Sequence, residues 1–185
     1  EYRAGGKLTG KTAIITGGDS GIGRAVAVAF AKEGADVMIV YLLANKDASE
    51  TKAAVESYGR RCETVRADLR QEPEAYRVVG EAMQAFGHID VLVNNIAVQV
   101  TQNSLADISA EQLEDTFRTN VFSYFYMTKA ALPHLMPGAS VINTTSVTAY
   151  KGSEDLIDYS SSKGAVVSLT RSLSMSLIKN GIRVN

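Results

Sequence analysis

A tyrosine and a lysine four positions apart are the pair of residues with the clearest chemical potential in this sequence. Tyr159 and Lys163 stand in the stretch Tyr-Ser-Ser-Ser-Lys, and residues at this spacing share one face of a helix. A free tyrosine has a pKa near ~10, which makes it a slow acid or base at neutral pH, and a neighbouring cation lowers that pKa. The pair could therefore move a proton in acid–base catalysis. Taken alone, the pattern is more typical of a chance or surface pairing.

Two polar residues elsewhere in the chain could assist such a pair. Ser146 follows a predicted strand, where its hydroxyl could hold a substrate oxygen beside Tyr159; the alternative is an ordinary turn residue. Asn120 lies inside a predicted helix, where asparagine is unfavourable because its side chain competes for backbone hydrogen bonds. Such a residue indicates a satisfied structural bond, a positioned water, or both.

A glycine-rich turn near the N-terminus suggests a phosphate-binding loop. The glycines Gly17, Gly21 and Gly23 have G-x-x-x-G-x-G spacing between a predicted strand and a predicted helix. Glycine lets the backbone turn sharply and approach a pyrophosphate, and the helix N-terminus offers unpaired N–H donors to the anionic oxygens. Asp19 and Ser20 add polar side chains at the mouth. The alternative is a strand-to-helix turn that binds nothing.

The choice between NAD and NADP stays open in this sequence. An acidic residue at the end of the second strand often holds the ribose hydroxyls, but Tyr41 and Leu42 occupy that place here. No arginine lies in the loop to receive a 2′-phosphate, and Lys46 is the nearest cation. Tyr41 could equally be a packing residue at the strand end. Asp68 could accept a hydrogen bond from an adenine amino group or cap the following turn.

The elements that must position these residues follow from hydrophobic periodicity and turn residues. Short apolar runs predict strands at 12–16, 36–43, 62–67, 89–94 and 139–145, with a final strand that starts at 182. Amphipathic stretches predict helices at 21–33, 47–58, 72–86 and 157–179, and a capping box of Ser109 and Gln112 opens another that runs to about 132. This alternation requires crossover connections. It therefore predicts an α/β fold, a Rossmann-type doubly wound parallel sheet in three layers with ligands at the carboxyl ends of the strands.

Composition narrows the class of protein. The 185 residues carry a formal net charge of −1 and are 45% hydrophobic, which is typical of a globular domain. A chain without a basic block is not expected to bind nucleic acid, and one without an apolar run of roughly 18 residues is not expected to span a membrane. Cys62, the one cysteine, fits a reducing cytoplasmic location and a role as a small core residue. With only His88 and His134 besides, both expected at helix ends or turns, no metal site is predicted.

The pattern divides into a loosely held tail at 1–10 and one continuous domain at 11–185. The sequence begins without methionine and stops in the predicted final strand, from which we expect a chain truncated at the start of its sixth strand.

Together these residues resemble the short-chain dehydrogenase/reductase family, over nearly the whole chain and in the family's order. The matching features are the glycine turn Thr16–Gly23, Asp68, Asn94-Asn95, Asn120, Ser146, and the Tyr159/Lys163 pair. The sequences of the tail and the glycine turn are similar to those of a bacterial branch of general-stress dehydrogenases and aldehyde reductases. The family's usual Asn-Asn-Ala-Gly is Asn-Asn-Ile-Ala here, which places Ile96 and Ala97 where backbone meets cofactor.

The resemblance implies a role for each matching residue. Tyr159 would be the acid/base, Lys163 would lower its pKa and hold the nicotinamide ribose, Ser146 would orient the reacting oxygen, and Asn120 would support a proton relay through water. The residues implied for cofactor binding are Gly17, Asp19, Ser20, Gly21, Ile22, Gly23, Tyr41, Leu42, Asp68, Leu69, Asn94, Ile96, Ala97, Tyr159 and Lys163.

The implied function is an NAD(P)-dependent oxidoreductase that acts on a small carbonyl, aldehyde or secondary alcohol substrate. The alternatives are a non-catalytic NAD(P)-binding redox sensor and an epimerase or dehydratase that uses the same cofactor transiently. The family's usual assembly implies a homodimer or homotetramer built on the long helices. The aromatic residues at 122 and 124–126 are expected to serve helix packing or subunit contact.

Overall fold

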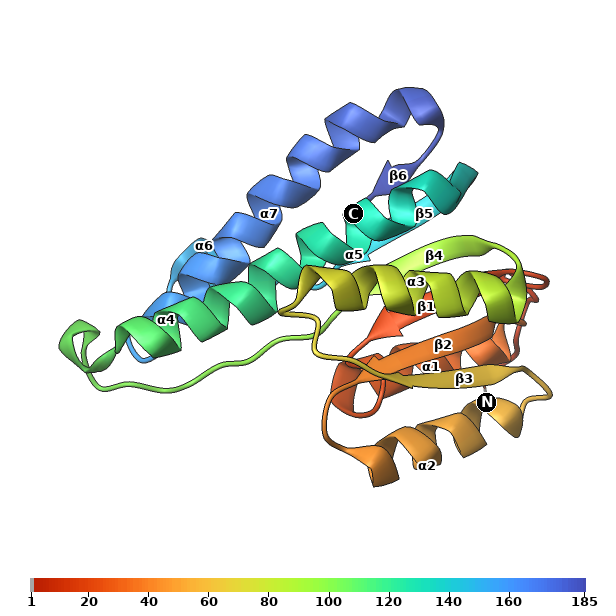
Figure 1. The fold of residues 1–185 in the computed structure, drawn as a ribbon, viewed down its shortest axis with the longest axis horizontal. Coiled ribbons are helices and arrows are strands. Elements are labelled where there is room, and N and C mark those ends of the chain that lie inside the picture. The colour runs from red at the N-terminus through yellow and green to blue at the C-terminus, as the bar shows by residue number, and fades with distance from the viewer. Residues whose placement is uncertain (1) are drawn as a thin grey trace.

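A single parallel sheet forms the centre of the molecule in the computed structural model, which describes residues 2–185 (Figure 1). Its six strands follow the order β3-β2-β1-β4-β5-β6, and every neighbouring pair is parallel. The strands are β1 (Thr12–Thr16), β2 (Asp36–Tyr41), β3 (Cys62–Arg66), β4 (Ile89–Asn94), β5 (Leu135–Asn143) and β6 (Arg183–Val184). The doubly wound parallel sheet predicted from the sequence is confirmed.

Helices connect the strands. The α-helices are α1 (Gly21–Lys32), α2 (Asn45–Glu56), α3 (Glu72–Phe86), α4 (Ala110–Phe117), α5 (Ser123–Ala131), α6 (Thr148–Lys151) and α7 (Ile157–Leu177). Shorter turns of 3-10 helix are η1 (Leu105–Asp107), η3 (Leu132–His134) and η4 (Ile178–Asn180), and η2 (Arg118–Phe122) is a π-helical turn. Across residues 2–185, none of these helices combines the length and the apolar character that crossing a membrane requires.

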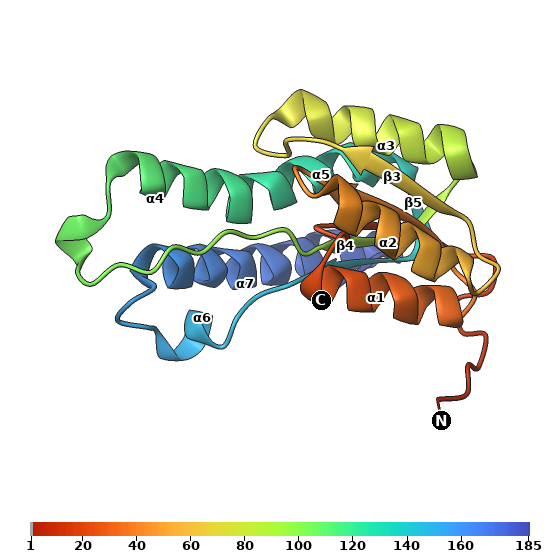
Figure 2. The same ribbon diagram turned by 90° about the horizontal axis from the view of Figure 1, so that it is seen from below.

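The core lies on both faces of the sheet. The five residues of β1 are all buried, and its three apolar residues alternate between two apolar clusters. Ile14 joins the cluster that includes residues of α3 and α5, whereas Ala13 and Ile15 join the one that includes residues of α1 and α2. Figure 2 shows α3 and α5 on one side of the sheet and α1 on the other. Strands buried on both faces are expected of a parallel sheet covered by helices.

The strand order reverses direction between β1 and β4, which lie side by side at the centre of the sheet. The crossover after β1 leads toward β2 on one side, and that after β4 leads toward β5 on the other. The connections therefore separate at the carboxyl ends of these two strands and leave a crevice, which is where open α/β sheets bind ligands. The glycine turn after β1 and Asn95 after β4 both reach this point.

Several predicted boundaries differ from the observed ones. The second strand ends at Tyr41 rather than at 43, because after Tyr41 the chain leaves the sheet and Leu42 O accepts a hydrogen bond from Arg66 Nε instead. The fifth strand starts at Leu135 rather than 139, with a register shift against β4 between Ile89 and Val91. It ends at Asn143, two residues earlier than predicted.

The long helix predicted from Ser109 to about 132 is interrupted. Ser109 does cap its start, since its hydroxyl accepts from Gln112 N, but the Gln112 side chain reaches Asp158 instead of completing a capping box. The π-helical turn η2 then separates α4 from α5, and it contains Asn120. Helical periodicity continues through such a turn, so the sequence pattern did not reveal it.

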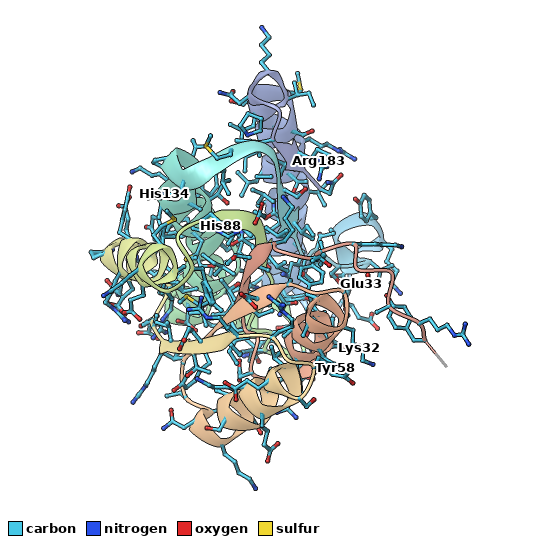
Figure 3. The ribbon with its side chains drawn as sticks, turned by 90° about the vertical axis from the view of Figure 1, so that its right-hand side faces the viewer. Lys32, Glu33, Tyr58, His88, His134 and Arg183 are labelled. Atoms are coloured by element: carbon cyan, nitrogen blue, oxygen red, sulfur yellow. The ribbon has the colours of Figure 1, made fainter. Side chains whose placement is uncertain are left out.

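The tail is held more firmly than predicted. The Glu33 carboxylate at the end of α1 accepts hydrogen bonds from Gly5 N and Lys7 N, and Leu8 N donates to the Glu33 carbonyl. These bonds lower the pKa of Glu33, with a bond from Tyr2 as the largest cause. Figure 3 shows the tail passing Glu33. Glu1 lies outside the described residues.

Candidate functional site

A cleft of about 690 Å³ opens at the switch point between β1 and β4. Its volume lies within the usual range for a small-molecule or cofactor site. The lining residues come from the ends of the first five strands and the turns after them, from the start of α1, and from α4, η2 and α7. They are Gly17, Asp19–Ile22, Tyr41–Ala44, Asp68–Arg70, Asn95–Val98, Asp115, Thr119, Thr144, Thr145, Tyr159 and Lys163. The structure thus brings the glycine turn and the Tyr159/Lys163 pair to a single cleft.

The glycine turn can form only with glycine at defined positions. Gly17 and Gly21 have positive φ angles of 65° and 51°, which other residues rarely adopt. Gly23 is buried, and a Cβ there would lie 1.9 Å from Gly17 O, so α1 packs directly on the turn. Gly23 therefore serves close packing and does not line the cleft. The sequence analysis did not single out Gly18, where a Cβ would lie 2.5 Å from Ile39 Cγ2.

Hydrogen bonds from neighbouring elements hold the turn in place. Asp19 O accepts from Arg24 Nε at 3.0 Å and from Thr51 Oγ1 at 2.9 Å, which ties the turn to α1 and α2. On the other side, Asn95 Nδ2 donates to Thr16 O and Gly17 O. Arg24 and Thr51 belong to no recognisable sequence motif, and only the fold shows that they hold the glycine turn.

The N-terminus of α1 offers free donors toward the cleft. Ser20 is its N-cap residue, but its side chain makes no capping bond, and the first backbone N–H with a helical acceptor is that of Arg24. The cleft at this end is lined by Ser20, Gly21 and Ile22, with open space above Gly21. Uncapped N–H groups beside a Cβ-free cradle fit the phosphates of a dinucleotide.

The ends of β2 and β3 form the far part of the cleft, where Tyr41, Leu42, Asp68 and Leu69 line it as predicted from the resemblance. Asp68 accepts from Arg70 Nε and N through Oδ1 and from Arg70 Nη2 through Oδ2. The Arg70 hydrogen bond is the largest cause of the lowered pKa of Asp68. The turn-capping interpretation is therefore confirmed, and the adenine contact stays a prediction.

Lys163 is almost completely buried, with 1% of its surface exposed, yet its ammonium has few partners. Nζ donates to Thr144 O at 2.9 Å and to the Tyr124 hydroxyl at 3.3 Å. Desolvation by burial lowers its pKa to about 8. The structure describes no carboxylate paired with it among residues 2–185.

Tyr124 is a residue of the site for which the sequence predicted only helix packing or subunit contact. Its ring is fully buried, and its hydroxyl donates to Thr144 O while it accepts from Lys163. Burial raises the pKa of Tyr124, which keeps it a neutral phenol. The only sequence signal for it was its position one helical turn after Asn120.

The Tyr159 ring is half-buried, and Lys163 Nζ lies 5.8 Å from the ring centroid. The tyrosine and lysine therefore share one face of α7, and that face points to the cleft. Ser146 lies in the turn after β5 but does not line the cleft; its Oγ accepts from Thr148 N and Oγ1. The catalytic roles of these residues stay predictions.

Two asparagines lie elsewhere than the resemblance implied. Asn94 is fully buried, and its Nδ2 donates to Thr128 Oγ1 and Asn143 Oδ1, so it cannot line the cleft and Asn95 does so instead. Asn120 is also buried, and it pairs with Val98 N and O and donates to Ser162 Oγ. The structural interpretation of Asn120 is confirmed, and its part in a relay stays a prediction.

The two histidines lie away from the cleft. His88 precedes β4 and His134 precedes β5, so both stand at the amino ends of strands, opposite the glycine turn (Figure 3). Among residues 2–185, no histidine, cysteine and acidic side chains gather in a group that could hold a metal ion. Cys62 is buried, as expected of a core residue.

Comparison with known proteins agrees with this fold. The family model of the short chain dehydrogenases matches residues 11–185, and the chain belongs to that family. Its sequence is 57% identical to the uncharacterized oxidoreductase YhdF of Bacillus subtilis, over all of this chain and 64% of that protein. It is 48% identical to the chloroplastic NADPH-dependent aldehyde reductase 1 of Arabidopsis thaliana, over all of this chain and 66% of that protein.

A short chain dehydrogenase from Burkholderia cenocepacia, solved in complex with NADP, superimposes with a TM-score of 0.93 at 34% identity. That match covers 97% of this chain and 73% of the other. The chain spans a little under two thirds of the length of these two curated relatives.

Replacing Gly23 with alanine should destabilise the full-length protein by about 1–3 kcal/mol, because the new methyl group would overlap the Gly17 carbonyl. Urea unfolding measures the change. The matched control is Gly80→Ala in α3, where nothing lies within 4 Å of the added Cβ. That change should stabilise the helix by roughly 0.5–1 kcal/mol. Equal effects at both positions would contradict the packing argument.

Replacing Lys163 with methionine should stabilise the cofactor-free protein by about 1–3 kcal/mol at pH 6, because methionine fills the same space without a buried charge. The folded-state pKa of about 8 lies below the ordinary lysine pKa of 10.5. The destabilisation of the native protein is therefore fully present below pH 8 and declines as the pH rises toward 10.5.

The advantage of methionine over the native residue should accordingly shrink at pH 10, as urea unfolding at the two pH values would show. Lys46→Met, at a side chain that is 90% exposed, is the control and should change stability little at either pH. A Lys163→Met variant less stable than the native protein at pH 6 would show that the ammonium stabilises the fold.

Proposed function

We propose that the full-length protein carrying this chain is an NAD(P)-dependent oxidoreductase that interconverts a carbonyl compound, including aldehydes, and the corresponding alcohol. One observation carries the proposal: a single cleft is lined by a phosphate-binding type of turn at one end and by Tyr159 and Lys163 at the other. Residues of the turn after β4, including Ile96 and Ala97, line the same cleft. A cleft with these two ends suits an elongated ligand.

The proposed roles divide along the cleft. The N–H groups at the start of α1 and the turn at Gly17 would bind the pyrophosphate, Tyr41 and Leu42 would contact the adenosine ribose, and Asp68 with Leu69 would contact the adenine. Lys163 would hold the nicotinamide ribose. When bound, the dinucleotide supplies a hydride for carbonyl reduction or accepts one in alcohol oxidation.

Tyr159 would donate its phenolic proton to the carbonyl oxygen during reduction and take it back during oxidation. Lys163, 5.8 Å from the ring centroid, would stabilise the negative charge that develops on the phenol oxygen as the proton leaves. Ser146 would hold the reacting oxygen, which requires its hydroxyl to turn from Thr148 toward the substrate. Asn120 would support the proton relay through water, and its side chain fixes the segment at Val98.

The cofactor and substrate can be resolved by one screen. Aldehydes, ketones and sugar alcohols are tested with both cofactors, and the absorbance of the reduced nicotinamide is followed. The names of the relatives support the NADP form and aldehydes as first choices. Net cofactor turnover would exclude the epimerase or dehydratase alternative, and binding without turnover of any substrate would favour the redox sensor.

We also propose that the protein is a homo-oligomer that functions in the cytoplasm. An apolar groove on α5 and α7 is lined by Phe122, Phe125, Tyr126, Leu132 and Leu173, and Phe125 is 51% exposed. Exposed apolar patches of this kind on soluble domains often mark subunit contacts. The free Cys62 thiol is compatible with a reducing compartment.

Tyr159→Phe should lower turnover by roughly 10²–10⁴-fold while cofactor affinity is kept, because it removes only the transferable proton. Steady-state rates and a fluorescence titration of the reduced cofactor measure the two effects. Tyr58→Phe, at an exposed tyrosine beyond α2, is the control and should leave both unchanged. Full activity of Tyr159→Phe would remove this residue from the mechanism.

Phe125→Glu should convert the oligomer to monomers, because it places a charge in the lining of the apolar groove. Sedimentation velocity measures the mass in solution. Tyr58→Glu adds the same charge at an exposed aromatic residue elsewhere and should leave the mass unchanged. A Phe125→Glu variant of unaltered mass would show that this face is not the contact.

A further inference from the structure

Directly before Tyr159 lies a buried carboxylate that the proposed mechanism does not use. Asp158 is 2% exposed, and within residues 2–185 the structure gives it no cationic partner. Its Oδ2 accepts from Thr116 Oγ1 at 2.7 Å and from Gln112 Nε2 at 3.1 Å, and its Oδ1 accepts from Tyr159 N at 2.8 Å. A carboxylate without a cation or hydrogen-bond donors is too costly to bury, so these three donors are what keeps it there.

The three partners require an acceptor-only group. The backbone N–H of Tyr159 and the Gln112 amide nitrogen can only donate, and the Thr116 hydroxyl also donates here. An asparagine would place an NH₂ group against at least one of these donors. The site is thus specific for a carboxylate and not merely for a polar residue of this size.

The position of Tyr159 in its helix explains what the carboxylate does. The helix α7 begins at Ile157, and its N-cap residue Leu156 has no side chain that can cap. The first internal backbone bond is that of Ser160 N to Leu156 O, so Tyr159 N is one of the unpaired donors of the first turn. Helix ends fray unless such donors are satisfied. Asp158 satisfies this one and joins the turn to α4.

A network extends from this carboxylate to Gln102 in the extended chain after β4, whose first residues, 95–98, line the cleft. Gln112 Oε1 accepts from Gln102 Nε2 at 2.6 Å, and Gln102 N donates to Asp155 O at 3.0 Å. In Figures 1 and 2 the extended chain after β4 runs out beside α4 and α7. On the opposite side, Ser162 Oγ donates to Tyr159 O and accepts from Asn120. Side chains therefore hold both the backbone N–H and the backbone carbonyl of Tyr159.

We propose that Asp158 is a positioning residue for Tyr159: its carboxylate, bonded to Gln112 and Thr116 of α4, fixes the first turn of α7 so that the phenol is held at the reacting oxygen. The inference rests on the proposed function, since it concerns the placement of the proposed proton donor. Asp158 does not touch the cleft and acts through the backbone of its neighbour.

The test compares Asp158→Asn with Glu154→Gln in the full-length protein; Glu154 is an exposed acid four residues earlier. Asp158→Asn should lower kcat roughly 10- to 100-fold, as expected for a displaced reacting group. The cofactor Kd should stay within about twofold, because the glycine turn is untouched. Amide exchange of residues 157–160 should rise about five- to tenfold, with the centre of α7 unchanged. Glu154→Gln should change none of these.

Thr116→Val keeps the shape of its side chain and removes one donor, so it should shift kcat and exchange in the same direction by less; it replaces Asp158→Asn if that variant does not fold. Unchanged exchange at 157–160, or kcat and cofactor affinity that fall together with the melting temperature, would overturn the proposal. Tyr159→Phe with full activity would instead overturn the proposed function, and the exchange measurement would still decide whether Asp158 fixes the turn.

Discussion

The burial of the Lys163 amine is the constraint around which the chemical end of this molecule is built. An ammonium removed from water loses hydration that few protein groups can replace. Here the Thr144 carbonyl and the Tyr124 hydroxyl accept hydrogen bonds from it, and the ring centroids of Tyr124 and Tyr159 lie 5.2 and 5.8 Å from Nζ. Neither partner carries a formal charge. No negative charge therefore neutralises the amine, which lines the cleft. Its positive charge is left for a ligand that binds there.

That arrangement requires three segments to meet. Thr144 follows the end of β5, Tyr124 lies in α5, and Lys163 lies in α7. The π-helical turn η2 sets the rotation of α5 relative to α4, and Asn120 within it bonds to Val98 and Ser162. An additional residue in a helix at such a point is common near functional sites. In this chain one helical run contributes both the buried Asn120, which bonds to Val98, and the buried Tyr124, whose hydroxyl accepts a hydrogen bond from the amine.

The opposite end of the cleft uses backbone rather than side-chain charge. No carboxylate stands at the end of β2, and the uncapped N–H groups of α1 face an open cradle. The turn is kept in shape from behind, since Arg24 and Thr51 both bond to the Asp19 carbonyl. The Asp68 carboxylate accepts hydrogen bonds from Arg70, whose guanidinium also donates to Asp115 on α4. Arg70 therefore joins the turn after β3 to α4, and all three of these charged residues line the cleft.

Features of this protein that depend on residues close together in the chain could be predicted from the sequence. Strand and helix alternation, the need for glycine at 17, 21 and 23, and the shared helical face of Tyr159 and Lys163 all follow from local geometry, which repeats with a known period. Contacts between distant segments were not accessible in this way. Asn94 is buried and Asn95 lines the cleft. Successive side chains point in opposite directions at a strand end, but the sequence does not say which of two adjacent asparagines points to the cleft. Tyr124, Thr144, Arg24 and Asp158 likewise acquired their roles only when folding brought residues up to 46 positions apart into contact, and the tertiary structure alone decided those pairings.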